Sequence, residues 1–188
     1  MEAFLVSTSV VALAEMGDKT QLLSFVLAAR LMRKVPIILG ILVATLANHF
    51  LAASVGAWLA SLVAPATLTW IIALSFIAFG IWTLRPDELG ETRALESGGV
   101  FVAALIAFFL VEMGDKTQLA TIALAGRYDG LAEVVAGTTL GMMVANVPAV
   151  WMGEALADRV NMKAMRVLAA ALFIVLGVLT LIAGIGSA

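Results

Sequence analysis

The chain of 188 residues is 63% hydrophobic and only 13% charged, with a mean hydropathy of +1.10. Ordinary soluble domains are about 45–50% apolar and about 25% charged, so this composition excludes a water-soluble globule and predicts a membrane protein. The formal net charge of -2 provides no basic patch for nucleic acid, and the absence of cysteine excludes disulfides, thiolate metal sites and thiol nucleophiles.

Six apolar stretches follow one another along the chain. Each is long enough to cross roughly 30 Å of hydrocarbon, which takes about 20 residues of α-helix. Turn residues and charged residues separate the stretches. The sequence therefore predicts an all-α integral membrane protein with six transmembrane helices, at Ala3–Ala29, Val35–Val63, Thr67–Leu84, Gly99–Ala125, Leu131–Gly153 and Met165–Ile185.

The positive charges near the ends of these stretches alternate between the two sides. The second and fourth connections contain only Arg127, whereas the others contain several Lys and Arg residues. Short cytoplasmic loops are enriched in these residues, so we expect both termini outside and the acidic connection 85–98 in the cytoplasm. The basic residues on the cytoplasmic side would be Arg30, Arg33, Lys34, Arg85, Arg93, Arg159, Lys163 and Arg166.

An eight-residue motif occurs twice. Glu15–Leu22 recurs letter for letter 97 residues later as Glu112–Leu119. Three helices per copy is an odd number, so the second copy would enter the membrane from the opposite side, as in many secondary transporters. The predicted organisation is a first three-helix repeat (1–84), an acidic linker (85–98) and a second, inverted three-helix repeat (99–188). The same offset pairs Arg30 with Arg127, Gly40 with Gly137, Gly56 with Gly153, Phe76 with Phe173, Gly80 with Gly177 and Thr83 with Thr180.

The two motifs place charged groups halfway through predicted helices. A charge at a helix centre costs about 2.5–3.5 kcal/mol on insertion scales, so these groups need mutual pairing, water or a bound ion. A continuous helix would carry Glu15 and Asp18 on one face, and Glu112 and Asp115 on the equivalent face. Two such faces in contact would bring four carboxylates together, and the motif lysines would leave two negative charges. This arithmetic suits a divalent cation, although a carboxylate could hold a proton instead.

Oxygen donors dominate both motifs. Carboxylates, amides and hydroxyls favour a hard ion such as magnesium, calcium or manganese. The glycine between Glu and Asp would weaken each helix, and an opened turn would add carbonyl ligands. The predicted metal ligands are Glu15, Asp18, Gln21, Glu112, Asp115 and Gln118, with Lys19, Thr20, Lys116 and Thr117 in a supporting role.

Two structural interpretations of the motifs stay open. Lys19 follows Glu15 by four residues, as Lys116 follows Glu112, so each motif could be a self-neutralised salt bridge that joins helices. In part, the two lysines would pair with a motif carboxylate whenever no cation is bound to it. The motif glycines could serve only close contact between helices.

A second group of polar residues lies outside the motifs. His49, the only histidine, follows Asn48 in the second stretch and corresponds to Asn146 at the repeat offset. A proton relay or a nitrogen ligand is one interpretation, and a histidine hydrogen-bonded between helices is the other. Pro148 lies in the fifth stretch and would free a backbone carbonyl near Asn146.

The doubled Glu-x-Gly-Asp-Lys-Thr motif resembles the signature of a cation/proton antiporter family. That family includes the eukaryotic Golgi manganese and calcium transporters and the MneA-type manganese exporters of bacteria. The likeness covers the full chain in size, span count and repeat structure, and as sequence it rests on the two octapeptides. It implies cation binding by Glu15, Asp18, Glu112 and Asp115, with the chain in a bacterial plasma (inner) membrane.

The compact bacterial members are the most similar, which implies a secondary transporter, not an enzyme, that exports Mn²⁺ from the cytoplasm in exchange for protons. A Ca²⁺/H⁺ antiporter and a cation channel with an acidic selectivity site are the alternatives. An intramembrane enzyme fits the near-identical inverted copies less well. We expect no resident cofactor; the partners would be a divalent metal ion, protons and the lipid bilayer, not nucleic acid, and a homodimer stays open.

Overall fold

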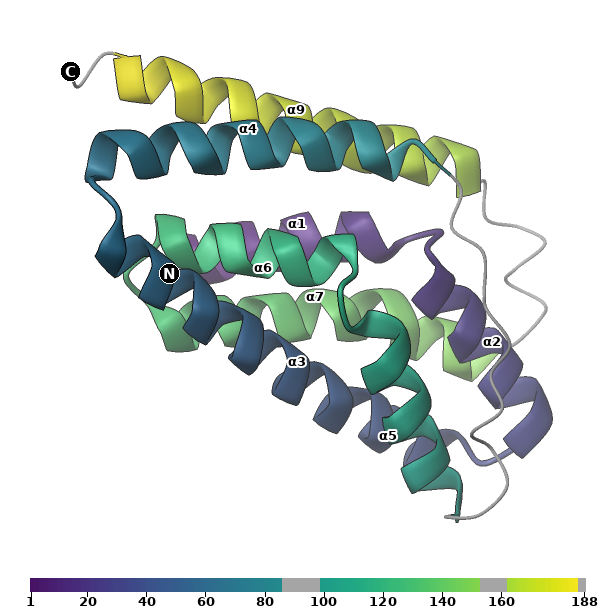
Figure 1. Cartoon of the computed structure of the whole chain (residues 1–188). Helices are drawn as coiled ribbons and strands as arrows, with labels where there is room; N and C mark the ends of the chain where they lie inside the picture. The colour runs from purple at the N-terminus through teal and green to yellow at the C-terminus, as the bar shows by residue number, and fades with distance from the viewer. Residues whose placement is uncertain (86–98, 153–161, 186–188) are drawn as a thin grey trace.

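Figure 1 shows the computed structural model, which describes residues 1–85, 99–152 and 162–185. These residues form α-helices and no strands. The helices are α1 (Glu2–Glu15), α2 (Lys19–Leu31), α3 (Lys34–Leu62), α4 (Pro65–Thr83), α5 (Gly99–Glu112), α6 (Lys116–Arg127), α7 (Leu131–Met152) and α9 (Met162–Ile185).

Three helices are long and apolar enough to cross a membrane unaided, judged by length and composition. They are α3, α4 and α7, while Gly99–Glu112 and Val167–Ile182 are apolar but shorter. Four of the predicted helices coincide with α3, α4, α7 and α9 to within a few residues. The helical, apolar character expected from the sequence is therefore confirmed for these elements.

The two stretches that carry the motifs are not single helices. The first divides into α1 and α2, and the fourth into α5 and α6, in each case within the motif. The prediction of one continuous helix at each position is therefore wrong, whereas the opened turn expected at the glycine is confirmed. A glycine in a left-handed conformation lies two residues after the end of each first half-helix, and a right-handed helix cannot continue through a positive φ.

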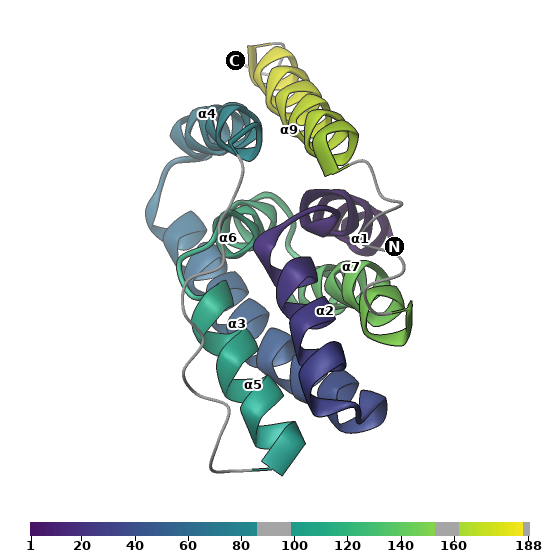
Figure 2. The same cartoon turned by 90° about the vertical axis from the view of Figure 1, so that its right-hand side faces the viewer.

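The main helix contacts join one half of the chain to the other. α1 packs on α7, and its counterpart α5 packs on α3, while α4 packs on its own counterpart α9. α4 and α9 form a two-helix layer that covers α1 and α6, as Figure 2 shows. This is the packing pattern of two copies related by a two-fold axis.

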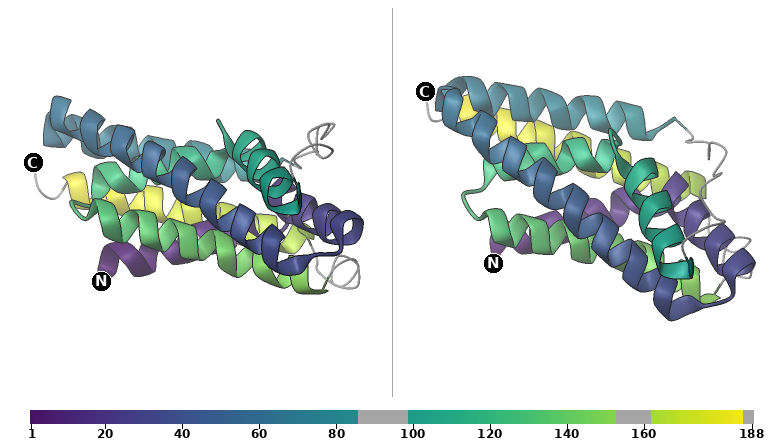
Figure 3. Two further views of the ribbon diagram at one scale, coloured as in Figure 1. Left: turned by 90° about the horizontal axis from the view of Figure 1, so that it is seen from below. Right: turned by 60° about the horizontal axis from the view of Figure 1, so that its bottom comes forward.

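Counterpart helices also run in opposite directions. In Figure 1, α4 runs from left to right and its counterpart α9 from right to left, while α3 runs from right to left and its counterpart α7 from left to right. The first residue of α1 and the last residue of α9 lie at one end of the bundle, together with the turns α3–α4 and α6–α7 (Figure 3). The start of α3 and the end of α4 lie at the other end.

Glycines bring the paired helices close together. A Cβ atom added to Gly40 of α3 would lie 2.7 Å from the carbonyl oxygen of Phe101 in α5. At Gly137 of α7, the counterpart, it would lie 2.5 Å from the carbonyl oxygen of Phe4 in α1. Because backbone meets backbone at these points, α1 and α5 are held firmly, and so are the motifs at their C-terminal ends.

Candidate metal-binding site

The motif begins where α1 ends. Glu15 is the last residue of α1, Met16 is extended, and Gly17 has a φ of 85° before Asp18 caps α2. The second motif repeats this geometry, with Gly114 at a φ of 83°. Glutamate and aspartate therefore do not share one helix face at a spacing of three residues, as the sequence predicted, but lie on either side of a break.

Glutamine side chains stabilise both breaks. The backbone N–H of Gly17 donates to Oε1 of Gln21 at 2.9 Å, and the N–H of Gly114 donates to Oε1 of Gln118 at 2.7 Å. Gln21 also donates from Nε2 to the carbonyl oxygen of Ala145 in α7 at 3.0 Å. The glutamine oxygens expected as metal ligands thus already accept hydrogen bonds that an interrupted helix needs.

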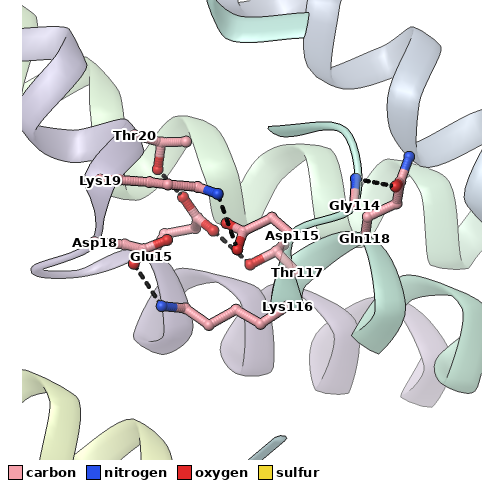
Figure 4. Close-up of polar contacts among 9 residues, drawn as sticks. All are labelled: Glu15, Asp18, Lys19, Thr20, Gly114, Asp115, Lys116, Thr117 and Gln118. Carbon is pink, nitrogen blue, oxygen red and sulfur yellow. Dashed lines mark hydrogen bonds and ion pairs between the residues drawn. The ribbon is translucent and has the colours of Figure 1, made fainter. Parts of the chain in front are cut away.

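The lysines connect the two motifs instead of neutralising their own. Nζ of Lys116 lies 2.5 Å from Oδ1 of Asp18, and Nζ of Lys19 lies 3.2 Å from Oδ1 of Asp115 (Figure 4). Within the described part of the chain, the two lysines pair with these aspartates and not with the glutamates four residues before them. The alternative of a self-neutralised salt bridge inside each motif therefore gains no support. A broken helix no longer presents residues four apart as neighbours, which is the physical reason.

Three buried carboxylates converge between the breaks. One oxygen each from Glu15, Glu112 and Asp115 lies within 4.8 Å of the others. The side chain of Asp18 is buried beside them in its ion pair with Lys116, so three of the four predicted carboxylates form the group and the fourth holds a lysine. These carboxylates come from both halves of the chain, as the sequence predicted.

Two threonines reach the same glutamate. Thr20 donates from its hydroxyl to Oε2 of Glu15, and Thr117 donates to Oε1 of Glu15 at 2.5 Å. Glu112 is equally buried, yet neither of its carboxylate oxygens has a hydrogen-bond partner among the described residues. An unpartnered buried carboxylate is costly, which is why such a group points to a missing cation or proton.

The second polar group comprises Asn48, His49 and Asn146. Asn146 accepts a hydrogen bond from the hydroxyl of Ser24 at 2.8 Å, and Asn48 donates to the carbonyl oxygen of Phe109 at 3.1 Å. His49 is fully buried, and neither ring nitrogen has a partner within the described ranges. The group of carboxylates that could hold a metal does not include His49. The hydrogen-bonded alternative for His49 gains no support here.

Sequence reasoning missed two groups near the site. Ser24 and the carbonyl of Ala145 tie α2 to α7 through Asn146 and Gln21. Ser24 follows Gln21 by three residues, so helical spacing could have placed it on the same face. The carbonyl of Ala145 carried no signal, because the side chain that donates to it belongs to Gln21, 124 positions away, and only tertiary packing brings the two together.

The arrangement suits a hard divalent ion. Metal–oxygen distances of about 2.0–2.6 Å place ligands on opposite sides of an ion roughly 4–5 Å apart, which matches the spread of these carboxylate oxygens. The group itself consists of carboxylate oxygens, and the two lysines offset part of the negative charge. The residues can therefore bind a cation such as Mn²⁺ or Ca²⁺ with carboxylate oxygens alone.

Comparisons with known proteins agree with this chemistry. The family model described as "Divalent cation/proton antiporter GDT1" matches residues 3–91 and, a second time, residues 100–188. The chain is 46% identical to a Vibrio cholerae protein named "Putative manganese exporter", over 96% of this chain and 90% of that one. It is 27% identical to GDT1-like protein 5 of Arabidopsis thaliana, covering 97% of this chain and 96% of the relative. The protein of the same name in rice is also 27% identical, over 96% and 94%. No solved structure matches.

Proposed function

Because the chain belongs to the GDT1 family of divalent cation/proton antiporters, we propose that it exports Mn²⁺ from the cytoplasm in exchange for protons. The single observation that carries the proposal is the buried group of Glu15, Glu112 and Asp115, drawn from both halves of the chain. Such a group in an apolar helical protein needs a positive charge to be stable. A transported cation and protons provide that charge in turn.

The proposed exchange uses the same carboxylates twice. When the cation leaves, protons take its place on Glu15, Glu112 or Asp115, and when a new cation binds, those protons depart. Lys19 pairs with Asp115 and Lys116 with Asp18 across the motifs, and these ion pairs hold whatever charge the two aspartates retain. The inward proton gradient of a bacterial cell then drives the metal outward.

We further propose six membrane crossings, formed by two inverted repeats in the plasma (inner) membrane. The repeats are 1–84 and 99–188, joined by the cytoplasmic linker 85–98, and both termini lie outside. The double match to the family model and the opposed directions of counterpart helices support this arrangement (Figure 1). In it α1 with α2, and α5 with α6, each make one interrupted crossing.

Flux into proteoliposomes tests the function. An imposed pH gradient is expected to move Mn²⁺ against its concentration gradient in the wild type. Replacing both glutamates, Glu15→Gln and Glu112→Gln, is expected to abolish this movement, because amides cannot exchange a cation for protons. Glu133→Gln, an exposed glutamate outside the cluster, is the matched control and should keep wild-type flux. Flux that survives the double replacement contradicts the proposal.

The same assay separates the alternatives. Equal concentrations of Mn²⁺ and Ca²⁺ in competition identify the preferred ion, since both bind oxygen ligands. A channel would pass cations down their gradient with no effect of the pH difference. Mn²⁺ movement that depends on the pH difference supports the antiporter.

A further inference from the structure

Most contacts of one motif have an equivalent contact in the other. The ion pair of Lys116 with Asp18 has its counterpart in Lys19 with Asp115. The hydrogen bond from Gly17 to the glutamine four residues later is likewise repeated at Gly114. The two motifs are therefore nearly equivalent in how their breaks and their lysines are held.

The threonines break this equivalence. If the motifs were fully equivalent, each bond to Glu15 would have a counterpart to Glu112. Thr117 would donate to Glu112 as Thr20 donates to Glu15, and Thr20 would donate to Glu112 as Thr117 donates to Glu15. Neither of these bonds is formed, because both hydroxyls donate to Glu15. Both oxygens of Glu112 stay without a partner in the described residues.

The two breaks also differ in their exposure. Gly17 is buried, whereas Gly114 is exposed, and its neighbour Met113 is 53% exposed. The break beside the glutamate that both threonines hold is thus buried, and the break beside the unpartnered glutamate is exposed. A protein with two equivalent halves has a second state available in which these roles are reversed.

We propose that Thr20 and Thr117 are positioning residues that together hold one motif glutamate at a time. They hold Glu15 in the state described here, and Glu112 in the opposite state, in which the break at Gly17 is the exposed one. A hydroxyl has a single proton to donate, so it cannot serve both glutamates at once. The free glutamate is then the one available to the cation. This inference rests on the proposed function, since it assigns a role within that site.

Hydrogen–deuterium exchange without metal tests the inference. It compares deuterium uptake at the break around Gly17 with uptake at the break around Gly114. Glu15→Gln weakens the acceptor used in the described state, so the ratio of the two states should shift about tenfold toward exposure of Gly17. Glu112→Gln should shift the ratio the opposite way.

Variants of the threonines make the test specific. With Thr20→Val and Thr117→Val together, the opposite effects of the two glutamine variants should disappear, because valine keeps the shape but donates no hydrogen bond. Thr20→Ser with Thr117→Ser keeps the donors and should restore the opposite effects. Thr121→Val is the control, because this buried hydroxyl donates to the carbonyl oxygen of Thr117 in its own helix.

The outcomes are separable from those of the transport assay. Shifts of opposite sign that vanish with the valine pair support the exchange of threonines between glutamates. Shifts of the same sign, no shift, or opposite shifts that persist in the valine pair overturn it. The measurement needs neither Mn²⁺ nor flux, so its failure leaves the proposed export to be judged by proteoliposomes alone.

Discussion

At the scale of single residues, each motif depends on a glycine in a conformation that other residues avoid. Gly114 has a φ of 83°, and a Cβ atom added there would meet nothing within 4 Å. Its role is therefore conformational and not a matter of close helix contact, which was the alternative interpretation of the motif glycines. The break that separates Glu112 from Asp115 exists because this residue is glycine.

Gly114→Ala is expected to lower the free energy of unfolding by about 1–2 kcal/mol, the cost of a left-handed conformation for an L-residue. Denaturation by SDS, followed through tryptophan fluorescence, measures it. Gly130→Ala is the control, because this glycine has no left-handed φ and its added Cβ would make only ordinary contacts. Equal stability of both variants would contradict the assignment.

Tyr128, the single tyrosine, offers a pH-dependent signal at the turn after α6. Burial, and next the charge of Glu2, raise the pKa of Tyr128 above its ordinary value of 10.0. The phenol also donates a hydrogen bond to Glu2. The folded protein therefore favours the neutral phenol, and its contribution to stability is present below the unfolded pKa and is lost as the pH rises through the folded pKa.

Absorbance at alkaline pH is expected to report one tyrosine ionisation above pH 10.0. Glu2→Gln should lower that midpoint, because it removes the negative charge that opposes ionisation. Glu133→Gln should leave the midpoint where it is, since this glutamate pairs with the N-terminal amine instead. A midpoint that does not respond to Glu2→Gln would contradict the contact.

At the scale of helices, the two halves are joined by pairs that contain one helix from each half. α1 of the first half packs on α7 of the second, and α5 packs on α3. Gly137 and Gly40 make these contacts close, at equivalent positions of the repeat. The motifs end α1 and α5, so the same contacts set where the carboxylates meet.

Gly137→Ala is expected to destabilise the protein by about 1–3 kcal/mol, the usual cost of overpacking. The added Cβ would lie 2.5 Å from the carbonyl oxygen of Phe4, and a helix backbone cannot easily move away to relieve that clash. Gly126→Ala, a helical glycine whose nearest such contact is 3.6 Å, should be close to neutral. Thermal denaturation in detergent compares the two, and equal midpoints would refute close contact as the role of Gly137.

At the scale of the whole molecule, α1 begins and α9 ends at the same end of the bundle (Figure 3). That end carries Arg127, while Arg33 and Lys34 lie at the other end, where α3 begins. The distribution of charge along the sequence and the ends of the helices in space thus agree.

Cysteine labelling is expected to reveal this orientation, because the chain has no cysteine of its own. Ser61→Cys and Asp129→Cys, in exposed positions near the α3–α4 and α6–α7 turns, should react with an impermeant maleimide added to intact cells. Arg33→Cys should react only after permeabilisation. The reverse pattern would place the termini in the cytoplasm and make the proposed direction of export untenable.

Much of the site could be predicted from the sequence because the motif is duplicated. The meeting of acids from two halves and the opening at the glycine followed from eight repeated letters and their spacing. The pairing of Lys19 with Asp115 did not, because a helix rule assigned each lysine to its own motif. Once Gly17 breaks the helix, that rule no longer applies, and neighbours are set by packing.

Composition and repetition by themselves determined that this protein is helical, apolar and built from two similar halves. Those properties are local or statistical, so they can be read along one chain. Only the tertiary structure decided which residues pair with the charged groups. Examples are the ion pair of Asp18 with Lys116 and the hydrogen bonds from two threonines to Glu15. Such contacts join residues about a hundred positions apart, and they depend on how α1, α2, α5 and α6 meet in space.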